Sequence, residues 1–382
     1  MKILYVDQTG QLGGGELALL PWLTSNSAGA CVALFEDGPF RSLLEDHGIA
    51  VEVLTLDRLK EVRRESGIVP ILLALPVFFS LCRRLAKLAS GFEMLYANSQ
   101  KAFLVAAMAK RRGQPLVWHL RDILTGEHFH PILRKIAVFA GNQYASVIIA
   151  NSHATAESFI AAGGRRDKVR VVHDGVSPQP FDSIDSHVLK ALGNEVGSGI
   201  RPTIGLFGRL SPWKGQHILL EALSGIPDAH AVLVGDALFG ETEYAETLRA
   251  RAQQPDIAGR VHFLGFRQDI PGLMRCMDII VHTSTSPEPF GLVIVEAMLA
   301  RKPVIATRAG GAVEIIRDGT NGLLVSPGSV PQLQAAIERL LADSVLARRL
   351  GEAGRSRAEE AFSQVASFEG ISGLLQRLEQ TG

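Results

Sequence analysis

The chain has 382 residues, of which 47% are hydrophobic, and its 39 lysines and arginines balance its 39 aspartates and glutamates. This length exceeds the roughly 250 to 300 residues at which a single core stops growing, so it predicts two domains. The charge balance gives no general electrostatic reason to bind nucleic acid, and three widely spaced cysteines without a CxxC motif argue against a disulfide framework or a zinc site. These features, with an amino terminus whose apolar part is too short for a signal peptide, favour a reducing, cytoplasmic compartment.

The first half of the chain alternates short aliphatic runs with helix-like segments. The runs are continuous rather than alternating in polarity, which is typical of a parallel sheet covered by helices on both faces. The predicted strands are residues 3–6, 31–35, 51–54, 94–97, 116–119, 147–150 and 169–172.

The longest apolar run, residues 67–82, is flanked by basic residues on both sides. It falls short of the roughly 20 residues that span a bilayer and contains Pro70 and Pro76, so it is not predicted to cross a membrane. Two interpretations stay open: residues 57–90 make a peripheral contact with the anionic inner face of a membrane, or the run is a buried helix with solvated ends. The flanking cations are Arg58, Lys60, Arg63, Arg64, Arg83, Arg84 and Lys87.

A stretch rich in Pro, Ser and Gly, residues 177–202, separates this pattern from a second set of strands. We therefore predict two doubly wound α/β domains, residues 1–178 and 202–361, joined by a linker at 179–201. A final helix, residues 362–382, is expected to pack back on the first domain. Loops at the carboxyl ends of the two sheets would then line a cleft. The second set of strands is 203–207, 231–234, 261–264, 279–281, 304–306 and 323–325.

The loop GRLSPWKG follows the first strand of the second set. Ser211 is a candidate helix cap and Pro212 suits the first helical position, so Arg209 and Lys214 would lie at a helix amino terminus. That end already carries partial positive charge, and each additional cation there costs roughly 0.3 to 1 kcal/mol. A phosphate or diphosphate between the two cations would reverse this cost. The alternative is two solvated surface cations.

The stretch EPFGLVIVEAM places Glu288 and Glu296 eight residues apart. Pro289 disfavours a helix at Glu288, so the helix would begin near Phe290 and Gly291, with the carboxylates on the order of 12 Å apart. This exceeds the roughly 5 to 9.5 Å of glycosidase acid/base pairs and favours two contacts on one elongated ligand. Hydroxyls at each end and phosphates in the middle describe a nucleotide diphosphate sugar, with Glu296 on the ribose and Glu288 on the sugar. The alternative is a capping role for Glu288 and a distant basic partner for Glu296.

EPFGLVIVEAM resembles the E-x7-E motif of the family-four retaining glycosyltransferases, whose GT-B fold consists of two facing Rossmann-like domains. The segments GRLSPWKG, LVGDALFG, FLGFRQDI and RAGGAVEIIRDGTNGLLV are similar to other parts of this family, in the same order. The resemblance covers nearly the whole chain and implies that Arg209 and Lys214 hold the donor diphosphate, Glu288 the donor sugar and Glu296 the ribose. The further donor-binding residues that it implies are Gly208, Gly235, Phe266, Arg267, Phe290, Gly291 and Leu292.

In the amino-terminal half the resemblance is looser. QTGQLGGGELALL is similar to the family's glycine loop, which implies that amide groups of Gly14 and Gly15 lie near the donor phosphate and the acceptor, with Glu16 opening the next helix. VWHLRD resembles the strand end that presents a histidine to the donor sugar, which assigns this role to His119; a structural histidine is the alternative. VHDGVSP departs from the family's Asn-Gly-Val-Asp turn, with Asp174 and Ser177 in place of the usual side chains.

The resemblance implies retaining transfer of a sugar from a nucleotide diphosphate sugar to an acceptor hydroxyl, in the synthesis of a cell-surface glycan or glycolipid. No Asp-x-Asp motif follows a predicted strand, so we expect neither a metal nor another cofactor. The residues assigned to catalysis are His119, Arg209, Lys214 and Glu288. No general base is assigned, because in this family the leaving phosphate oxygen is thought to take the acceptor's proton. The acceptor, whether a glycan, a lipid-linked molecule or a small molecule, and the donor's base and sugar are not readable from the sequence.

Two other functions fit parts of the sequence. GGGELA from Gly13 matches a G-x-G-x-x-A pattern and Glu36 ends the next strand, as in NAD-dependent oxidoreductases, but this leaves the cations and glutamates of the second half unexplained. A nucleotide-sugar epimerase or a noncatalytic binding protein of similar fold is the other alternative.

Overall fold

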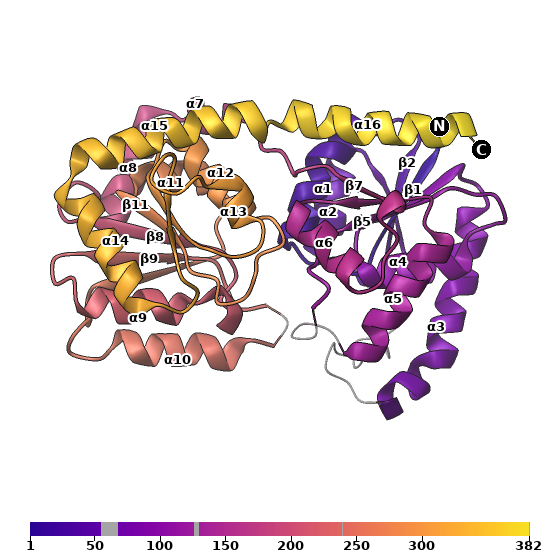
Figure 1. Ribbon diagram of the computed structural model, residues 1–382, viewed down its shortest axis with the longest axis horizontal. Helices are drawn as coiled ribbons and strands as arrows, with labels where there is room; N and C mark the ends of the chain where they lie inside the picture. The colour runs from indigo at the N-terminus through magenta and orange to yellow at the C-terminus, as the bar shows by residue number, and fades with distance from the viewer. Residues whose placement is uncertain (55–67, 126–129, 239, 382) are drawn as a thin grey trace. The chain divides into compact units, whose positions relative to one another are not determined.

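The computed structural model describes residues 1–54, 68–125, 130–238 and 240–381 (Figure 1). The chain divides into two compact units, Met1–Asp174 with Ser367–Gly382, and Gly175–Ala366. Each unit contains a parallel sheet with helices packed on both faces. The predicted fold class, with a Rossmann-like α/β architecture in each half of the chain, is confirmed.

The first unit is built on a sheet with the strand order β3-β2-β1-β4-β5-β6-β7. Within the described residues every pairing of these strands is parallel, and the predicted strands are recovered to within one residue at either end. The central strands are apolar on both faces because helices cover both. The strands are β1 (Ile3–Asp7), β2 (Ala30–Leu34), β3 (Ala50–Val53), β4 (Met94–Ala97), β5 (Leu116–Leu120), β6 (Val147–Ala150) and β7 (Val169–Val171).

Two groups of helices form the two cores of this unit. Side chains of α1, α2 and α16 pack on one face of the sheet, and side chains of α3, α4, α5 and α6 pack on the other. Ser99 caps α4 and Ser152 caps α6, each accepting a hydrogen bond from a backbone N–H of the first turn. The helices are α1 (Gly14–Ser25), α2 (Pro39–Asp46), α3 (Ile68–Ala89), α4 (Gln100–Ala109), α5 (Pro131–Tyr144), α6 (His153–Ala161) and the 3-10 turn η2 (Arg166–Lys168).

Helix α3 contains most of the long apolar run. Its described side chains begin at Pro76, and of these Leu81 and Leu85 are buried in the core whereas Phe79 is exposed. Searched over the part of the chain that the structure describes, no helix combines the length and the apolar character needed to cross a bilayer. Residues 57–67 of the predicted membrane segment lie outside the described residues.

The second unit repeats the architecture with the strand order β10-β9-β8-β11-β12-β13. The strands of this sheet, too, pair in parallel wherever the structure describes them. Helices α9, α10 and α14 pack on one face of the sheet, and α8, α11, α12 and α13 on the other. The strands are β8 (Thr203–Phe207), β9 (His230–Val234), β10 (Val261–Gly265), β11 (Ile279–His282), β12 (Val304–Thr307) and β13 (Leu323–Val325). The helices are α9 (Gln216–Ser224), α10 (Thr242–Ala252), α11 (Ile270–Cys276), α12 (Leu292–Leu299), α13 (Ala312–Ile315), α14 (Val330–Ala342) and α15 (Ser344–Ala361).

Residues 179–201, predicted to be a linker, form two helices that belong to the second unit. These are α7 (Gln179–Asp182) and α8 (Ser186–Val196). Phe181, Leu192 and Val196 are buried in the same core as α11. The linker prediction followed the Pro, Ser and Gly content of the stretch, which overlooked apolar residues at helical spacing that have a surface to pack against.

The carboxyl-terminal helix α16 (Gln364–Thr381) contributes to the first unit from Ser367 onward. Ile371, Leu374 and Leu375 are buried in the core that also contains α1 and α2. Phe368 contacts the Trp22 ring edge-to-face, with 5.4 Å between the ring centroids. These contacts explain why the last helix is part of the first unit although 192 residues of the second unit, Gly175–Ala366, precede it.

Candidate functional site

The sheet of the second unit reverses its strand order between β8 and β11, where ligands bind in doubly wound folds. The loop after β8 carries both predicted cations, and the loop after β11 leads to α12. The two loops are joined by Thr283, whose Oγ1 donates to the carbonyls of Lys214 and Gly215 at 3.0 and 2.9 Å. Arg209, Lys214 and Glu288 therefore lie on loops at the switch point of one sheet.

Lys214 and Glu288 form a largely buried ion pair. Nζ of Lys214 donates to both carboxylate oxygens of Glu288, at 2.9 and 2.7 Å, and lies 4.2 Å from the centroid of the Trp213 ring. Burial alone would raise the pKa of Glu288, but Lys214 and His282 outweigh it and hold that pKa well below its usual range. Glu288 is therefore ionised at neutral pH.

Two further hydrogen-bond donors reach Glu288. Nε2 of His282 lies 3.2 Å from Oε2, and Oγ of Ser284 donates to the same oxygen at 3.1 Å. Because the ionised carboxylate can only accept, Nε2 is the protonated ring nitrogen of His282. The sequence prediction missed both residues. The signal that would have found them is a polar residue at the carboxyl end of a central apolar strand.

Arg209 also has a carboxylate partner. Its Nε lies 3.1 Å from Oε2 of Glu241, and Oγ of Ser211 donates to the other oxygen of Glu241. Both predicted cations are thus paired with carboxylates distant in the sequence, which the sequence prediction did not consider. Their assignment to the diphosphate stays a prediction.

The local structure around Lys214 also differs from the prediction. Residues Pro212–Lys214 form a 3-10 turn (η3), Gly215 adopts a left-handed conformation with φ of 71°, and α9 begins only at Gln216. From the described residues, Ser211 accepts no capping hydrogen bond. Lys214 therefore ends a short turn before α9 rather than lying in the first turn of that helix.

Glu296 lies in the middle of α12 and is only part-buried. In the described part of the chain, its carboxylate forms neither a hydrogen bond nor an ion pair, so the alternative of a distant basic partner is not found there. Desolvation raises its pKa to about 7. A partly desolvated carboxylate without a hydrogen-bond partner lowers the stability of the folded chain. A ligand that donates hydrogen bonds to it would offset this cost.

Two predicted glycines, Gly208 and Gly235, adjoin each other at the carboxyl ends of β8 and β9. Gly235 has φ of 136°, and a Cβ added to it would lie 2.1 Å from the carbonyl oxygen of Gly208. Only glycine fits this position, so the backbones of the two loops approach each other with no side chain between them.

The predicted pair Phe266 and Arg267 follows β10. The Phe266 side chain is 53% exposed. The Arg267 guanidinium is engaged by Glu195 and Asp269, with a shortest N to O distance of 2.6 Å to each. A role of Arg267 in donor binding stays a prediction, and it would require this guanidinium to leave carboxylates that already neutralise it.

Phe290, Gly291 and Leu292 form the entry to α12. The Phe290 ring is buried against Phe362, with 5.6 Å between the ring centroids, so its side chain stabilises the core. Gly291 is the N-cap residue with φ of 108°, and none of the described side chains caps the first N–H groups of the helix. What these residues can offer a ligand is therefore backbone N–H groups at the positive end of the helix dipole.

In the first unit, α1 begins at Gly14, with Glu16 as its third residue. Oε2 of Glu16 accepts a hydrogen bond from the N–H of Gly13 at 3.1 Å. A Cβ added to Gly14 would meet no atom of the described residues within 4 Å, and one added to Gly15 would lie 3.5 Å from Cδ of Arg121. The backbone around Gly14 is therefore uncovered within this unit.

A chain of polar side chains follows the switch point between β1 and β4, and the sequence prediction missed most of it. Asn98 donates to Asp7 at 2.7 Å, Arg121 donates to Asn98 at 2.9 Å, and Arg121 also pairs with Asp174 at 2.6 Å. Burial, with the neighbouring Asp7, raises the pKa of Glu16 to about 8. This network fixes the positions of the strand ends around the glycine loop.

His119 is buried at the end of β5, with 1% of its surface exposed. Nδ1 lies 2.6 Å from the hydroxyl oxygen of Tyr96 and 3.3 Å from Nη2 of Arg121. Arginine can only donate, so Nδ1 accepts and Nε2 carries the proton. Burial and Arg121 hold the pKa of His119 well below its usual range, so the ring is neutral. Among the described residues Nε2 has no hydrogen-bond partner, which leaves one donor for a ligand.

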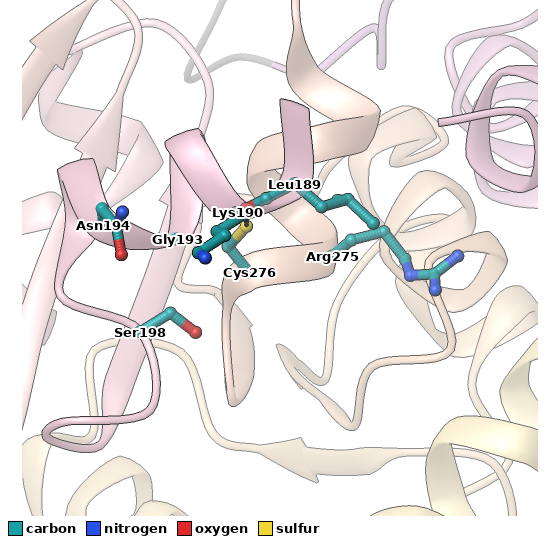
Figure 2. Close-up of a pocket in the computed structure, with 7 residues that line it drawn as sticks. All are labelled: Leu189, Lys190, Gly193, Asn194, Ser198, Arg275 and Cys276. Carbon is teal, nitrogen blue, oxygen red and sulfur yellow. Dashed lines mark hydrogen bonds between the residues drawn. The ribbon is translucent and has the colours of Figure 1, made fainter. Parts of the chain in front are cut away.

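A separate hollow of about 370 Å³ lies between α8 and the end of α11 in the second unit (Figure 2). None of the predicted site residues lines it. Its lining residues are Leu189, Lys190, Gly193, Asn194, Ser198, Arg275 and Cys276.

Two family models match successive parts of the chain. Residues 41–179 match the model described as Glycosyltransferase Family 4, and residues 198–357 match the model described as Glycosyl transferases group 1. The chain is 31% identical over 228 residues to the lipopolysaccharide core biosynthesis glycosyltransferase LpsE of Rhizobium meliloti, a match that covers 60% of this chain and 63% of that relative. It is 33% identical over 225 residues to spore coat protein SA of Bacillus subtilis, covering 56% of this chain and 59% of that relative. The chain thus spans somewhat less than two thirds of these curated relatives.

A likeness to solved structures extends over the full length. HepE from Anabaena, solved in complex with UDP-glucose, is 40% identical with a TM-score of 0.90, covering 99% of this chain and 100% of HepE. HepE in complex with UDP and glucose matches with the same TM-score and identity, over 98% and 99% of the two chains. Sucrose-phosphate synthase from Thermosynechococcus elongatus has a TM-score of 0.80 at 20% identity, over all of both chains, and supports the fold alone.

Proposed function

The chain belongs to the family-four glycosyltransferases of GT-B fold, and from this premise we propose that it transfers a sugar from a nucleotide diphosphate sugar to an acceptor hydroxyl in glycan or glycolipid synthesis. The observation that carries the proposal is the Lys214, Glu288 and Glu296 arrangement at the switch point of the second sheet. HepE, a relative that matches over its full length, is solved with UDP-glucose. A UDP-sugar, with UDP-glucose as the first candidate, is therefore the proposed donor.

The proposed roles follow from charge and hydrogen-bonding capacity. Lys214 and Arg209 leave their carboxylate partners to stabilise the diphosphate, whose negative charge grows as it departs. Glu296 accepts the ribose hydroxyls and Glu288 accepts those of the sugar. His119, in the first unit, donates its Nε2–H to the sugar.

We further propose that transfer retains the anomeric configuration and needs no metal or other cofactor. In this proposal the diphosphate is stabilised by the amides at the start of α12 and by Arg209 and Lys214, which supply positive charge without a metal. The anomeric configuration of the product, followed by NMR, tests the first point. Full activity in excess EDTA is the outcome expected for the second.

Donor binding is tested by thermal shift against UDP-, GDP-, ADP- and TDP-sugars and against NADH. UDP-glucose at about 100 times its dissociation constant is expected to stabilise the chain by about 2.7 kcal/mol, with a smaller effect of the other nucleotides. Stabilisation by NADH instead would support an oxidoreductase.

Turnover separates the remaining alternatives. Release of UDP that depends on an added acceptor is the expected result. An isomerised nucleotide sugar would identify an epimerase, and binding without turnover a noncatalytic relative.

A peripheral membrane contact is proposed for three neighbouring helices of the first unit. Helix α4 packs against both α3 and α5, and Figure 1 shows the three together. No Asp or Glu occurs in any of the three, although the whole chain has equal numbers of acids and bases. Ile132, Ile136 and Phe139 of α5 are 45%, 47% and 60% exposed and lie on one side of the helix, at i, i+4 and i+7. The cations on these helices are Arg83, Arg84, Lys87, Lys101, Arg134 and Lys135.

These helices combine an exposed apolar stripe with basic side chains and carry no acidic ones. Such a surface is complementary to an anionic lipid surface. We expect the chain to co-sediment with vesicles that contain phosphatidylglycerol, and to lose most of this binding at high salt. The double substitution Ile136→Ser and Phe139→Ser should weaken vesicle binding about tenfold or more, since each side chain contributes roughly 1.5 to 3 kcal/mol when buried. Val345→Ser is the matched control, because Val345 is 66% exposed in the second unit. Equal binding of both variants, or binding to neutral vesicles alone, would contradict the proposal.

A further inference from the structure

The Glu288 carboxylate is held by donors from two different loops. Nζ of Lys214 reaches it from the loop after β8, whereas His282 and Ser284 reach it from the end of β11 and the residues that follow. His282 is held more rigidly than Lys214. The carbonyl of His282 accepts a hydrogen bond from Thr307 Oγ1 at 3.1 Å, and the imidazole is buried with 6% exposure. Lys214 instead ends a flexible four-carbon side chain.

Lys214 cannot keep both of its hydrogen bonds to Glu288 while it also binds a diphosphate. In the ligand-free chain its ammonium group donates to both oxygens of Glu288. Phosphate oxygens that arrive beside this ammonium compete for the same protons, because it has only three. The donors that Glu288 keeps are then His282 and Ser284, both on Oε2.

The imidazole of His282 has a feature that packing does not explain. Nδ1 is buried and has no hydrogen-bond partner among the described residues. An unpaired buried acceptor destabilises the folded chain, and an apolar side chain of similar size would avoid this cost. The hydrogen bond from Nε2 to Glu288 is the interaction that an apolar side chain would lose.

We propose that His282, assisted by Ser284, is a positioning residue that holds Glu288 toward the donor sugar once Lys214 has turned to the diphosphate. This inference rests on the proposed function, since it takes a nucleotide diphosphate sugar as the ligand. His282 acts through Glu288 and does not touch the ligand. Its effect is therefore confined to the sugar part of the donor.

The test compares UDP-glucose with UDP by titration calorimetry. In the His282→Leu variant the dissociation constant of UDP-glucose rises about tenfold, whereas that of UDP changes less than twofold. His282→Gln, which can still donate an N–H to Glu288, recovers most of the loss. Since the two residues act as one unit, adding His282→Leu to Glu288→Gln produces little further loss.

Other outcomes overturn the inference. An equal loss for UDP and UDP-glucose in His282→Leu would show a purely structural role, and a full additional tenfold loss on top of Glu288→Gln would show that His282 does not act through Glu288. If His282→Leu fails to fold, Ser284→Ala is expected to show the same selective loss, to a smaller extent, and no selectivity there refutes the proposal. A wild-type chain that binds neither UDP nor UDP-glucose would instead refute the proposed function.

Discussion

Replacing Lys214 with alanine is expected to lower the rate of sugar transfer by about 100-fold or more. The substitution removes the part-buried ammonium group proposed to stabilise the departing diphosphate, and loss of one such charge donor typically costs 100- to 1,000-fold in kcat. It also leaves the Glu288 carboxylate without the cation that contributes most to lowering its pKa. The measurement is kcat/KM for UDP-glucose with a saturating acceptor.

The matched control is Lys190→Ala. Lys190 is exposed, lies in the same unit and lines the hollow between α8 and α11, where no predicted site residue occurs (Figure 2). Its substitution should leave transfer unchanged. Arg209→Ala is expected to follow Lys214→Ala in direction and size. A near wild-type rate in either variant would remove the corresponding cation from the proposed mechanism.

Replacing Glu296 with glutamine is expected to have two opposite effects. The variant loses a charged acceptor for the ribose hydroxyls, and hydrogen bonds to charged groups contribute about 1.5 to 3 kcal/mol each, so donor affinity should fall about 10- to 100-fold. The same substitution should stabilise the free chain, because it removes a part-buried carboxylate that forms no ion pair with the described residues. Titration with UDP-glucose and thermal unfolding measure the two effects.

The pH dependence of both effects follows from the raised pKa of Glu296, about 7 in the folded chain against 4.5 ordinarily. An acid whose folded pKa is raised binds its proton more tightly when folded, so its unfavourable contribution develops as the pH rises from 4.5 to 7 and persists above. The stability gain of Glu296→Gln should therefore be on the order of 1 to 3 kcal/mol at pH 8 and near zero at pH 4. Donor binding to the wild type, which requires the ionised form, should strengthen from pH 6 to pH 8.

Glu296→Gln itself serves as the control for pH. Because glutamine does not titrate, the donor affinity of the variant should stay the same between pH 6 and pH 8, whereas that of the wild type should rise. If the variant is less stable than the wild type at pH 8 and binds UDP-glucose equally well, Glu296 is a structural residue and not the ribose contact.

The strands could be predicted because the information is local. Each strand is a short continuous aliphatic run that both faces of the sheet bury, so its position needs no knowledge of its neighbours. That Glu296 has no basic partner on its own helix could also be predicted from local sequence. Its neighbours along α12 are apolar, so no basic residue lies one turn away. Helices α7 and α8 were mistaken for a linker because their stability comes from packing on α11, which sequence composition does not report.

The sequence by itself determined the α/β architecture of each unit, the E-x7-E stretch and the cations at the end of β8. Only the tertiary structure decided how these charges are paired. Lys214 meets Glu288 across 74 residues, and Arg209 meets Glu241 from another loop, because parallel strands bring their carboxyl ends to the same edge of the sheet. His282 and Ser284 instead reach Glu288 from within the same loop, six and four residues before it. Pairing of charges depends on distances in space, which the order of residues along the chain sets only through the fold.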